Sequence, residues 1–421
     1  MSGSTRNYSL PLRIARAILG FLIGCLLACA TAEASFRYIL FSDSEFALAQ
    51  SEHIRIPRYF ADSDADPDYF KLREIWSDVP PAEKFNPRDP KLGWLNSKIR
   101  TPNYRHAQAQ GIGDRRPFLF YGDSFTACVM PPKHCWEGLL ANTPLGNEVH
   151  LLNYGVRAFG FGQTNLLFEE SIDQWMPRKP IVAIGILVDN DLDRTIFNFR
   201  GAPKPRYKIE DGQLAVELPG EYDIAEWLAD NPPNISSYVI RYLTCRTNFL
   251  PDDWNPPRSN DPTIVARKKE LNLAVLESLH QSLESRDLDY FFVLFFGPKS
   301  WRREKPTGWR ENFIIDALDS LGIPWVSSRN AMRASITKYV GKNGKPPEGG
   351  LFFMGDPTTA GHFTRAGNLA ALPAITQGLL GQYDGLVKER DTRIELQPAK
   401  PATDEHSQTQ TEQTETSAPC D

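Results

Sequence analysis

Five short apolar segments, separated by stretches with helical periodicity, constrain the fold of this chain more than any other feature. The apolar segments lie at 117–121, 148–154, 180–188, 288–296 and 323–327. Continuous apolar runs of this length are typical of strands that are buried on both faces of a parallel sheet. Helical stretches are expected at 136–141, 163–175, 263–285, 310–321 and about 365–380. This alternation predicts an α/β protein with three layers, in which helices cover both faces of a doubly wound parallel sheet.

The regions outside this pattern set the expected domain limits. Residues 192–260 follow the third strand and contain Asp211-Gly212 between alternating residues, which predicts a β-hairpin insertion at the edge where such sheets bind ligands. Residues 35–115 are rich in Pro and Asp and are expected to wrap the sheet irregularly, so the core domain is placed at 116–385. Beyond residue 396 the chain has no aromatic residue, Leu, Ile, Val or Met, and 390–421 is expected to be a disordered tail.

The N-terminal segment, 1–34, has the features of an export or membrane signal. Arg6, Arg13 and Arg16 precede an apolar run over 17–32, which as a helix is about 24 Å long, close to the ~30 Å hydrocarbon core of a bilayer. The basic flank predicts that the N-terminus stays in the cytoplasm and that the rest is exported. Three interpretations fit: a single-pass membrane anchor, which we favour, a signal peptide cut within 32–35, and a lipoprotein acylated at Cys29. All three place the bulk of the chain outside the cytoplasm, for example in a periplasm.

Composition excludes several classes of partner and cofactor. The chain has 421 residues with 47 Lys and Arg against 52 Asp and Glu, and it has no long basic block, so no nucleic-acid surface is expected. Six cysteines over this length are too few for a disulfide scaffold. Cys128, His134 and Cys135 lack the two-residue ligand spacing of a zinc site, and no metal or cofactor is expected. In an oxidising compartment Cys128 and Cys135 either stay as thiols or form a disulfide at the rim of the site.

Ser124 is the candidate nucleophile. It follows the first strand in the sequence Gly122-Asp123-Ser124, where Gly122 permits a sharp turn and the N–H groups of a new helix are free to face an oxyanion. The simpler interpretation is that Asp-Ser caps the helix. A nucleophilic serine needs a base within hydrogen-bond reach. Among the seven histidines, His362 lies directly before the last helix, in a loop that opens on the same edge of the sheet as Ser124.

Four short motifs resemble, in order, the conserved blocks of the SGNH (GDSL-type) hydrolase superfamily. Gly122-Asp123-Ser124 resembles block I, residues 153–160 resemble block II, Asn190-Asp191 resembles block III, and Gly361-His362 resembles block V. The resemblance covers about residues 115–380 and implies a flavodoxin-like sheet. With its N-terminal helix and hairpin insertion, the chain is similar to membrane-anchored bacterial members of the superfamily.

The resemblance also implies a role for each matching residue. Ser124 would be the nucleophile and His362 the base. The backbone N–H groups of Ser124 and Ala158 and the side-chain amide of Asn190 would hold the oxyanion. Ala158 stands where the superfamily usually has glycine, and alanine does not adopt a positive φ cheaply, which puts the geometry of that loop in question.

The sequence departs further from the superfamily's pattern at the residue that would act as the acid of the triad. The superfamily usually has Asp two or three residues before the base, but positions 360 and 359 are Ala and Thr. Asp356 reaches His362 only if 357–360 loop out. Otherwise a backbone carbonyl orients the imidazole and the site is a Ser–His dyad.

These observations predict an exported serine esterase or acyl-transfer enzyme that works through an acyl-enzyme on Ser124. The substrate that the resemblance implies is an ester, with O-acylated carbohydrate as one class. The alternative is a catalytically silent module of the same fold that binds a cell-envelope glycan in the same cleft.

Overall fold

The computed structural model describes residues 10–77, 87–101, 104–247, 258–336, 351–355 and 361–382. These residues form two compact units. The larger unit takes its residues from 81–198, 202–224 and 260 onward, and the smaller unit from 1–80, 199–201 and 225–259. The segment 390–421, expected to be disordered, lies outside the described residues.

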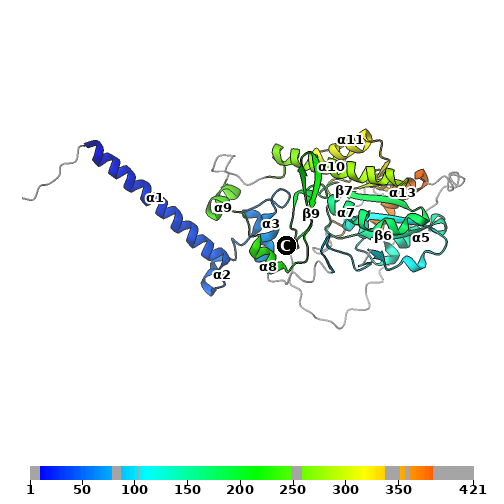
Figure 1. Ribbon diagram of the computed structural model, residues 1–421, viewed down its shortest axis with the longest axis horizontal. Coiled ribbons are helices and arrows are strands. Elements are labelled where there is room, and N and C mark those ends of the chain that lie inside the picture. Colours follow the sequence, from blue (N-terminus) through cyan, green and yellow to red (C-terminus); the bar gives the residue numbers. More distant parts are fainter. Residues whose placement is uncertain are drawn as a thin grey trace, which may run out of the picture. The chain divides into compact units, whose positions relative to one another are not determined.

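A parallel sheet of five strands forms the centre of the larger unit (Figure 1). Its strands, in spatial order, are β11 (Trp325–Ser327), β10 (Asp289–Phe295), β7 (Ile181–Leu187), β5 (Arg116–Gly122) and β6 (Val149–Gly155). All four neighbouring pairs are parallel. The chain runs from β5 to β6 on one side and then crosses to β7 on the other, so the order reverses between β5 and β7. Ligands bind at such a reversal, outside the carboxyl ends of the strands.

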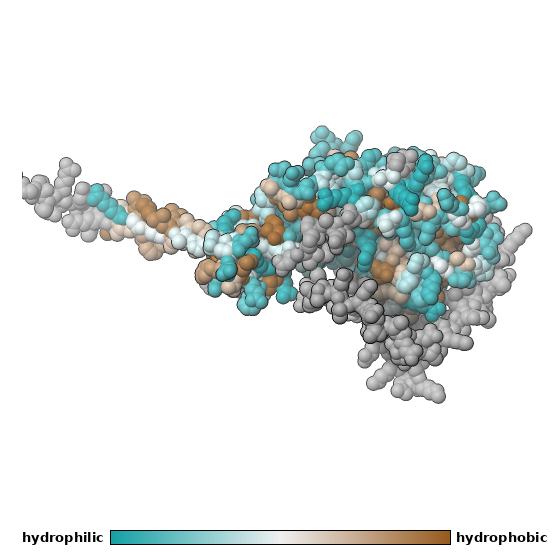
Figure 2. All heavy atoms as spheres, turned by 90° about the horizontal axis from the view of Figure 1, so that it is seen from below, coloured by the Kyte–Doolittle hydropathy of each residue, from teal (hydrophilic) through white to brown (hydrophobic). Residues whose placement is uncertain are grey.

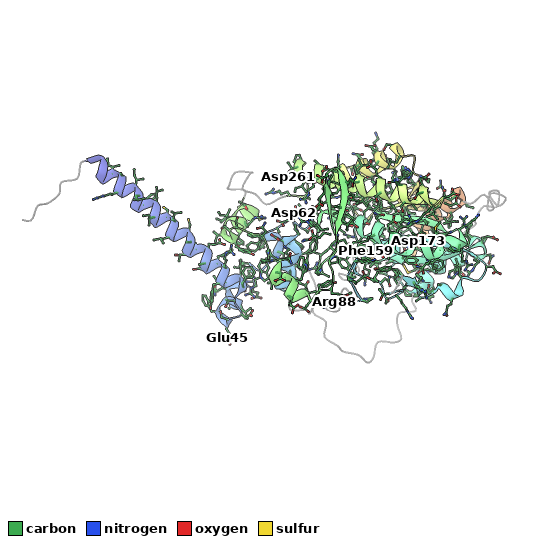
Figure 3. The ribbon with its side chains drawn as sticks, viewed as in Figure 1. Glu45, Asp62, Arg88, Phe159, Asp173 and Asp261 are labelled. Atoms are coloured by element: carbon green, nitrogen blue, oxygen red, sulfur yellow. A yellow bond between two sulfur atoms is a disulfide. The ribbon has the colours of Figure 1, made fainter. Side chains whose placement is uncertain are left out.

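Helices cover both faces of this sheet. Helices of the larger unit include α4 (Ser124–Ala127), α5 (Trp136–Ala141), α6 (Leu145–Glu148), α7 (Phe161–Ser171), α10 (Pro262–Ser285), α11 (Trp309–Ser320), α12 (Ser328–Ile336) and α13 (Arg365–Gln382). On β5, Phe120 packs against Trp136 of α5, and the next residue, Tyr121, packs against Phe168 of α7. Asp261 caps the first turn of α10 (Figure 3). The expected α/β fold with three layers is confirmed.

Helix α13 packs closely on the sheet through a glycine. A Cβ at Gly378 would lie 2.2 Å from the ring of Phe291 on β10, so a larger residue there would push the helix away. One expected helix differs from the structure. The stretch 163–175 is α-helical only to Ser171, and a 3-10 helix over Asp173–Arg178 follows, because Pro177 has no N–H for an α-helical bond.

The predicted hairpin is present in the larger unit. Strands β8 (Arg206–Glu210) and β9 (Gln213–Glu217) pair antiparallel. Asp211 and Gly212 at the turn have φ values of 51° and 77°, as a tight hairpin turn requires. Two shorter pairs lie before the sheet in sequence: β1 (Arg88–Asp89) with β2 (Gly93–Trp94), and β3 (Ile99–Arg100) with β4 (Arg105–His106).

The smaller unit is helical. It contains α1 (Leu10–Phe41), α2 (Glu45–Ser51), α3 (Asp68–Ile75), most of α8 (Ile224–Asp230) and α9 (Tyr238–Thr247). Its core is the cluster Leu40, Phe60, Leu72, Ile235 and Tyr238. Helices α2 and α3 lie in the stretch expected to be irregular.

Helix α1 is exposed along its apolar part and packs within the smaller unit near its C-terminal end. Residues 14–41 are long and apolar enough to cross a membrane, and apolar side chains along the helix are exposed (Figure 2). Toward its C-terminal end, Glu33 caps α9: its carboxylate accepts hydrogen bonds from Ser237 Oγ at 2.7 Å, from Tyr238 N at 3.0 Å and from Val239 N at 3.1 Å. The end of α1 is therefore a folded part of the smaller unit.

Candidate active site

Ser124 and His362 meet at the carboxyl edge of the sheet. Ser124 is the first residue of α4, directly after β5 and its turn, and is 8% exposed. Its Oγ lies 2.8 Å from His362 Nε2, a hydrogen bond between residues 238 positions apart in sequence. The structure thus brings together the two residues that the sequence suggested as nucleophile and base.

Local sequence explains the position of Ser124. Gly122 has φ 156°, and a Cβ there would lie 2.2 Å from Thr126 Oγ1 and 2.7 Å from the Gly185 carbonyl oxygen, so only glycine fits the turn. Asp123 is the N-cap residue of α4, and its Oδ1 accepts a hydrogen bond from Phe125 N at 2.8 Å. Its Oδ2 lies 3.3 Å from Ser124 Oγ.

The loop that carries His362 is held by backbone pairing. Met354 N donates to the His362 carbonyl at 2.8 Å, and Gly361 N donates to the Met354 carbonyl at 3.1 Å. Phe125, the residue after the serine, packs against the imidazole with ring centroids 5.4 Å apart. These contacts fix the imidazole next to the hydroxyl before any substrate binds. Asp356, the candidate acid, lies outside the described residues.

Ala158 lies in the loop between β6 and α7. Its φ is 66°, so alanine does adopt the left-handed conformation that glycine would take more cheaply. Alanine at this position therefore does not prevent the left-handed backbone that the motif comparison had put in question.

Asn190 follows β7, the strand that neighbours β5. Its backbone N–H donates to the Leu187 carbonyl at 3.2 Å, so it is also a turn residue. Among the described residues, no hydrogen-bond partner is found for its buried Oδ1. Ser124 and Asn190 both follow strands at the reversal between β5 and β7.

A buried charged cluster lies beneath the site. Asp123 and Asp191 are both buried, and Arg194 Nη1 lies 2.7 Å from Asp191 Oδ1 and 3.5 Å from Asp123 Oδ2. Burial raises the pKa of Asp191 well above its usual range and Asp123 raises it further, whereas Arg194 lowers it. Arg194 thus lies between the two buried carboxyl groups and compensates their charge.

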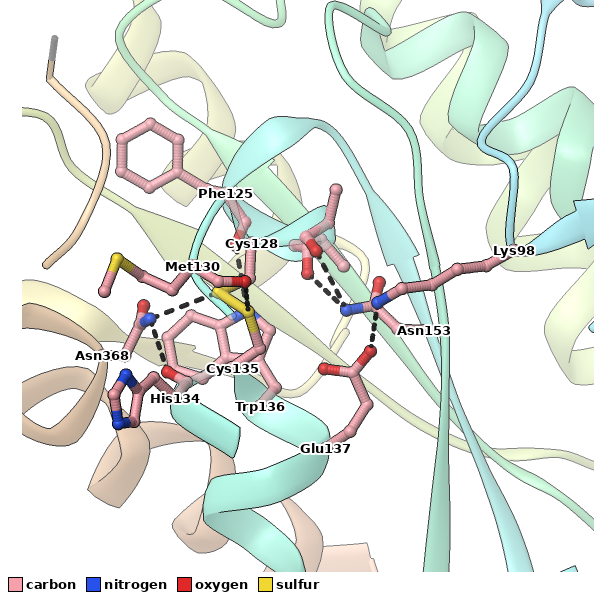
Figure 4. The surroundings of a disulfide bond; sticks show 12 residues. Lys98, Phe125, Cys128, Met130, His134, Cys135, Trp136, Glu137, Asn153 and Asn368 are labelled. Carbon is pink, nitrogen blue, oxygen red and sulfur yellow. Dashed lines mark hydrogen bonds and ion pairs between the residues drawn. A yellow bond between two sulfur atoms is a disulfide. The ribbon is translucent and has the colours of Figure 1, made fainter. Parts of the chain in front are cut away.

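A disulfide closes the loop beside the nucleophile. Cys128 and Cys135 are bonded, so of the two sequence alternatives the disulfide is the one found (Figure 4). Asn368 of α13 donates from Nδ2 to the His134 carbonyl at 3.0 Å and lies 3.3 Å from Cys128 Sγ. The loop is therefore fastened to the helix that follows the base. In the described parts of the chain, no group of three His, Cys, Asp or Glu residues is arranged to hold a metal ion.

Two residues of the site environment escaped the sequence analysis. Arg194 follows the block III motif by only a few residues. Its place close behind that motif was the signal that the sequence offered. Trp94 donates from Nε1 to the Arg157 carbonyl at 2.9 Å. It comes from a segment without periodicity, and no local pattern marks it.

No protein-family model and no curated protein sequence matches the chain. Several solved structures do. An acetylxylan esterase from Geobacillus stearothermophilus has 13% identity and a TM-score of 0.34, with 64% of this chain and 95% of that chain covered. A lipase/acylhydrolase from Enterococcus faecalis has 13% identity and a TM-score of 0.31, with 62% and 95% covered. A GDSL-like lipase from Bacteroides thetaiotaomicron has 13% identity and a TM-score of 0.30, with 66% and 94% covered. In structure, the chain is similar to GDSL-type lipases and acetylxylan esterases.

Proposed function

We propose that this protein is a serine esterase of the SGNH type that forms an acyl-enzyme on Ser124. The observation that carries the proposal is the 2.8 Å contact between Ser124 Oγ and His362 Nε2 at the carboxyl edge of the sheet. A serine hydroxyl is a weak nucleophile until a neighbouring base accepts its proton. The order of the four sequence motifs supports the same assignment.

The reaction follows from these positions. Ser124 Oγ attacks the ester carbonyl carbon while its proton passes to His362 Nε2. The bond to the alcohol then breaks, and His362 gives that proton to the leaving oxygen, which leaves an acyl group on Ser124. A water molecule, deprotonated by His362, attacks the acyl carbon and releases the acid; an acceptor hydroxyl in place of water would complete an acyl transfer.

The negative oxygen of each tetrahedral intermediate needs donors fixed in advance. We assign this task to the backbone N–H groups of Ser124 and Ala158 and to the side-chain amide of Asn190. The position of Ser124 as the first residue of α4 and the left-handed backbone at Ala158 support the assignment. As substrate class we propose esters, with O-acylated carbohydrates suggested by the motif resemblance.

We further propose that α1 anchors the protein in a membrane, with the larger unit on the outer side. The apolar length of α1 and the basic residues that precede its apolar run support this topology. The disulfide at Cys128 and Cys135 is typical of an oxidising compartment.

The test is labelling by a serine-reactive fluorophosphonate together with hydrolysis of a small aryl ester. Ser124→Ala and His362→Ala should each lower kcat by about 10⁴-fold or more, and the double variant should be little worse, because residues that act as a unit lose their effect together. Ser171→Ala is the control: Ser171 is also buried, and its Oγ lies 2.9 Å from the hydroxyl of Tyr121.

Wild-type protein that neither reacts with the fluorophosphonate nor hydrolyses the ester would contradict the esterase proposal. It would favour the alternative, a silent module that binds a glycan. Full activity in either single variant would remove the Ser–His mechanism.

A further inference from the structure

Two side chains hold the backbone on either side of Ala158. Trp94 Nε1 donates to the Arg157 carbonyl at 2.9 Å, and Arg194 Nη1 donates to the Phe159 carbonyl at 2.6 Å. Both side chains are buried, with Trp94 2% and Arg194 6% exposed. Phe159 itself lies inside the larger unit (Figure 3) and packs edge-on against Trp94, with ring centroids 5.7 Å apart.

The bond from Trp94 sets the direction of one particular N–H group. The Arg157 carbonyl and the Ala158 N–H belong to the same planar trans peptide, so the two groups point in opposite directions. Fixing the carbonyl on the indole therefore fixes the N–H. This matters because the left-handed conformation of Ala158 is unfavourable for an alanine and persists only where the surroundings hold it.

Arg194 connects this loop to the other two loops of the site. The same Nη1 lies 2.7 Å from Asp191 Oδ1, next to Asn190, and 3.5 Å from Oδ2 of Asp123, which caps the helix that begins at Ser124. The arginine comes this close because residue 160 is glycine: a Cβ at Gly160 would lie 2.6 Å from Arg194 Cβ.

Arg194 also balances charge that would otherwise separate these loops. Two carboxyl groups, Asp123 and Asp191, are buried together, and like charges at such a site repel strongly. The Arg194 carbonyl is itself fixed, since Lys204 Nζ donates to it at 2.6 Å. The backbone of Arg194 and its guanidinium are thus both held, the guanidinium by groups from all three loops.

We propose that Trp94 and Arg194 are positioning residues, which hold the peptide between Arg157 and Ala158 in the orientation in which its N–H serves as a donor to the oxyanion. This inference rests on the proposed function. Neither residue acts on the reacting atoms, and both act through the backbone that they hold.

Trp94→Phe is the deciding variant, because it removes the indole N–H and keeps a ring against Phe159. Loss of one oxyanion donor lowers kcat by about 10²–10³-fold, and a misdirected donor should lower it by about 10–100-fold. KM should change by less than about threefold, since the ground-state carbonyl needs this donor less than the oxyanion does. Labelling by the fluorophosphonate should slow by a similar factor to kcat, because its phosphoryl oxygen uses the same donors.

Trp175→Phe is the matched control. Trp175 is also buried and donates from Nε1, but to the hydroxyl of Tyr154 at 3.0 Å. It should lose comparable stability and keep its kcat. Wild-type kcat in Trp94→Phe would overturn the inference, whereas wild-type protein that neither hydrolyses esters nor labels would overturn the proposed function instead.

A second comparison tests Arg194. Arg194→Met should lower kcat and leave KM nearly unchanged, whereas Arg329→Met should keep kcat although it breaks an equally buried pair, Arg329 Nη2 to Glu311 Oε2 at 3.0 Å. The double variant Arg194→Met/Asp191→Asn restores the charge balance. It should recover thermal stability but not kcat, and recovery of both would show that Arg194 contributes only stability.

Discussion

Asp123 and Ser124 are adjacent in the chain and have different partners. The carboxylate of Asp123 accepts from Phe125 N and so caps α4, while the hydroxyl of Ser124 faces His362. The helix cap is therefore Asp123, and it is compatible with the proposed role of Ser124 as nucleophile.

The acid partner of His362 is open to a residue-scale test. We expect Asp356→Asn to change kcat by less than about tenfold, because Thr359 and Ala360 occupy the positions from which an Asp usually reaches the imidazole. Loss of an orienting carboxylate in a Ser-His-Asp triad lowers kcat by about 10⁴-fold. A loss of that size, measured with the same aryl ester and with Ser171→Ala as the folding control, would establish a triad in place of the dyad.

Among single residues, the sequence identifies candidate site residues that lie at the ends of strands and helices. Ser124 and His362 could be found because one follows an apolar strand and the other precedes a helix. Trp94 could not be found, since it contacts a backbone carbonyl 63 residues away and its own segment has no periodicity. Its role depends on tertiary contact, which a local pattern does not contain.

Among the elements, the strands are the most predictable. Four of them, β5, β6, β7 and β10, are buried almost throughout, and their runs of apolar residues reflect that burial directly; the edge strand β11 is only partly buried. Helices α2 and α3 were not expected, because their segments are short and close to Pro and Asp residues. They are stabilised by packing in the smaller unit more than by their own sequence.

The disulfide element carries a prediction about stability. Replacing both Cys128 and Cys135 by Ser opens a loop with a sequence separation of 7, and the entropy of the unfolded chain should lower the free energy of unfolding by about 2.5 kcal/mol. For a unit of this size we expect the Tm to fall by roughly 5–10 °C in a thermal scan. Cys245→Ser, which changes a free cysteine of the smaller unit, should leave it unchanged. An unaltered Tm in the double variant would show that the loop is held without the disulfide.

For the whole molecule, the question is whether the first helix remains attached. Cleavage after residue 34 would remove Glu33, whose carboxylate caps α9 and lies 2.6 Å from Arg37. The smaller unit would lose the cap of α9, although Leu40 of its core and Phe36, which packs against that core, would remain. This favours the retained anchor over the cleaved signal peptide.

We therefore expect the intact chain in the membrane fraction after alkaline extraction, with an N-terminal peptide that still contains Glu33 when examined by mass spectrometry. Cys29→Ser should fractionate in the same way, because no acyl group at Cys29 is needed to hold a spanning helix. A soluble chain beginning near Ser35, or release of Cys29→Ser from membranes, would contradict this topology.

The cap between Glu33 and α9 also sets an order of events during synthesis. Glu33 and Tyr238 are 205 positions apart, so the ribosome completes the carboxylate long before it completes the helix that the carboxylate caps. Contacts of such wide separation form slowly. The smaller unit cannot close until more than half of the chain has been made, whereas β5, β6 and β7 of the larger unit are already complete by residue 187. The part of the chain that is made first therefore waits for α9 before its own unit can close.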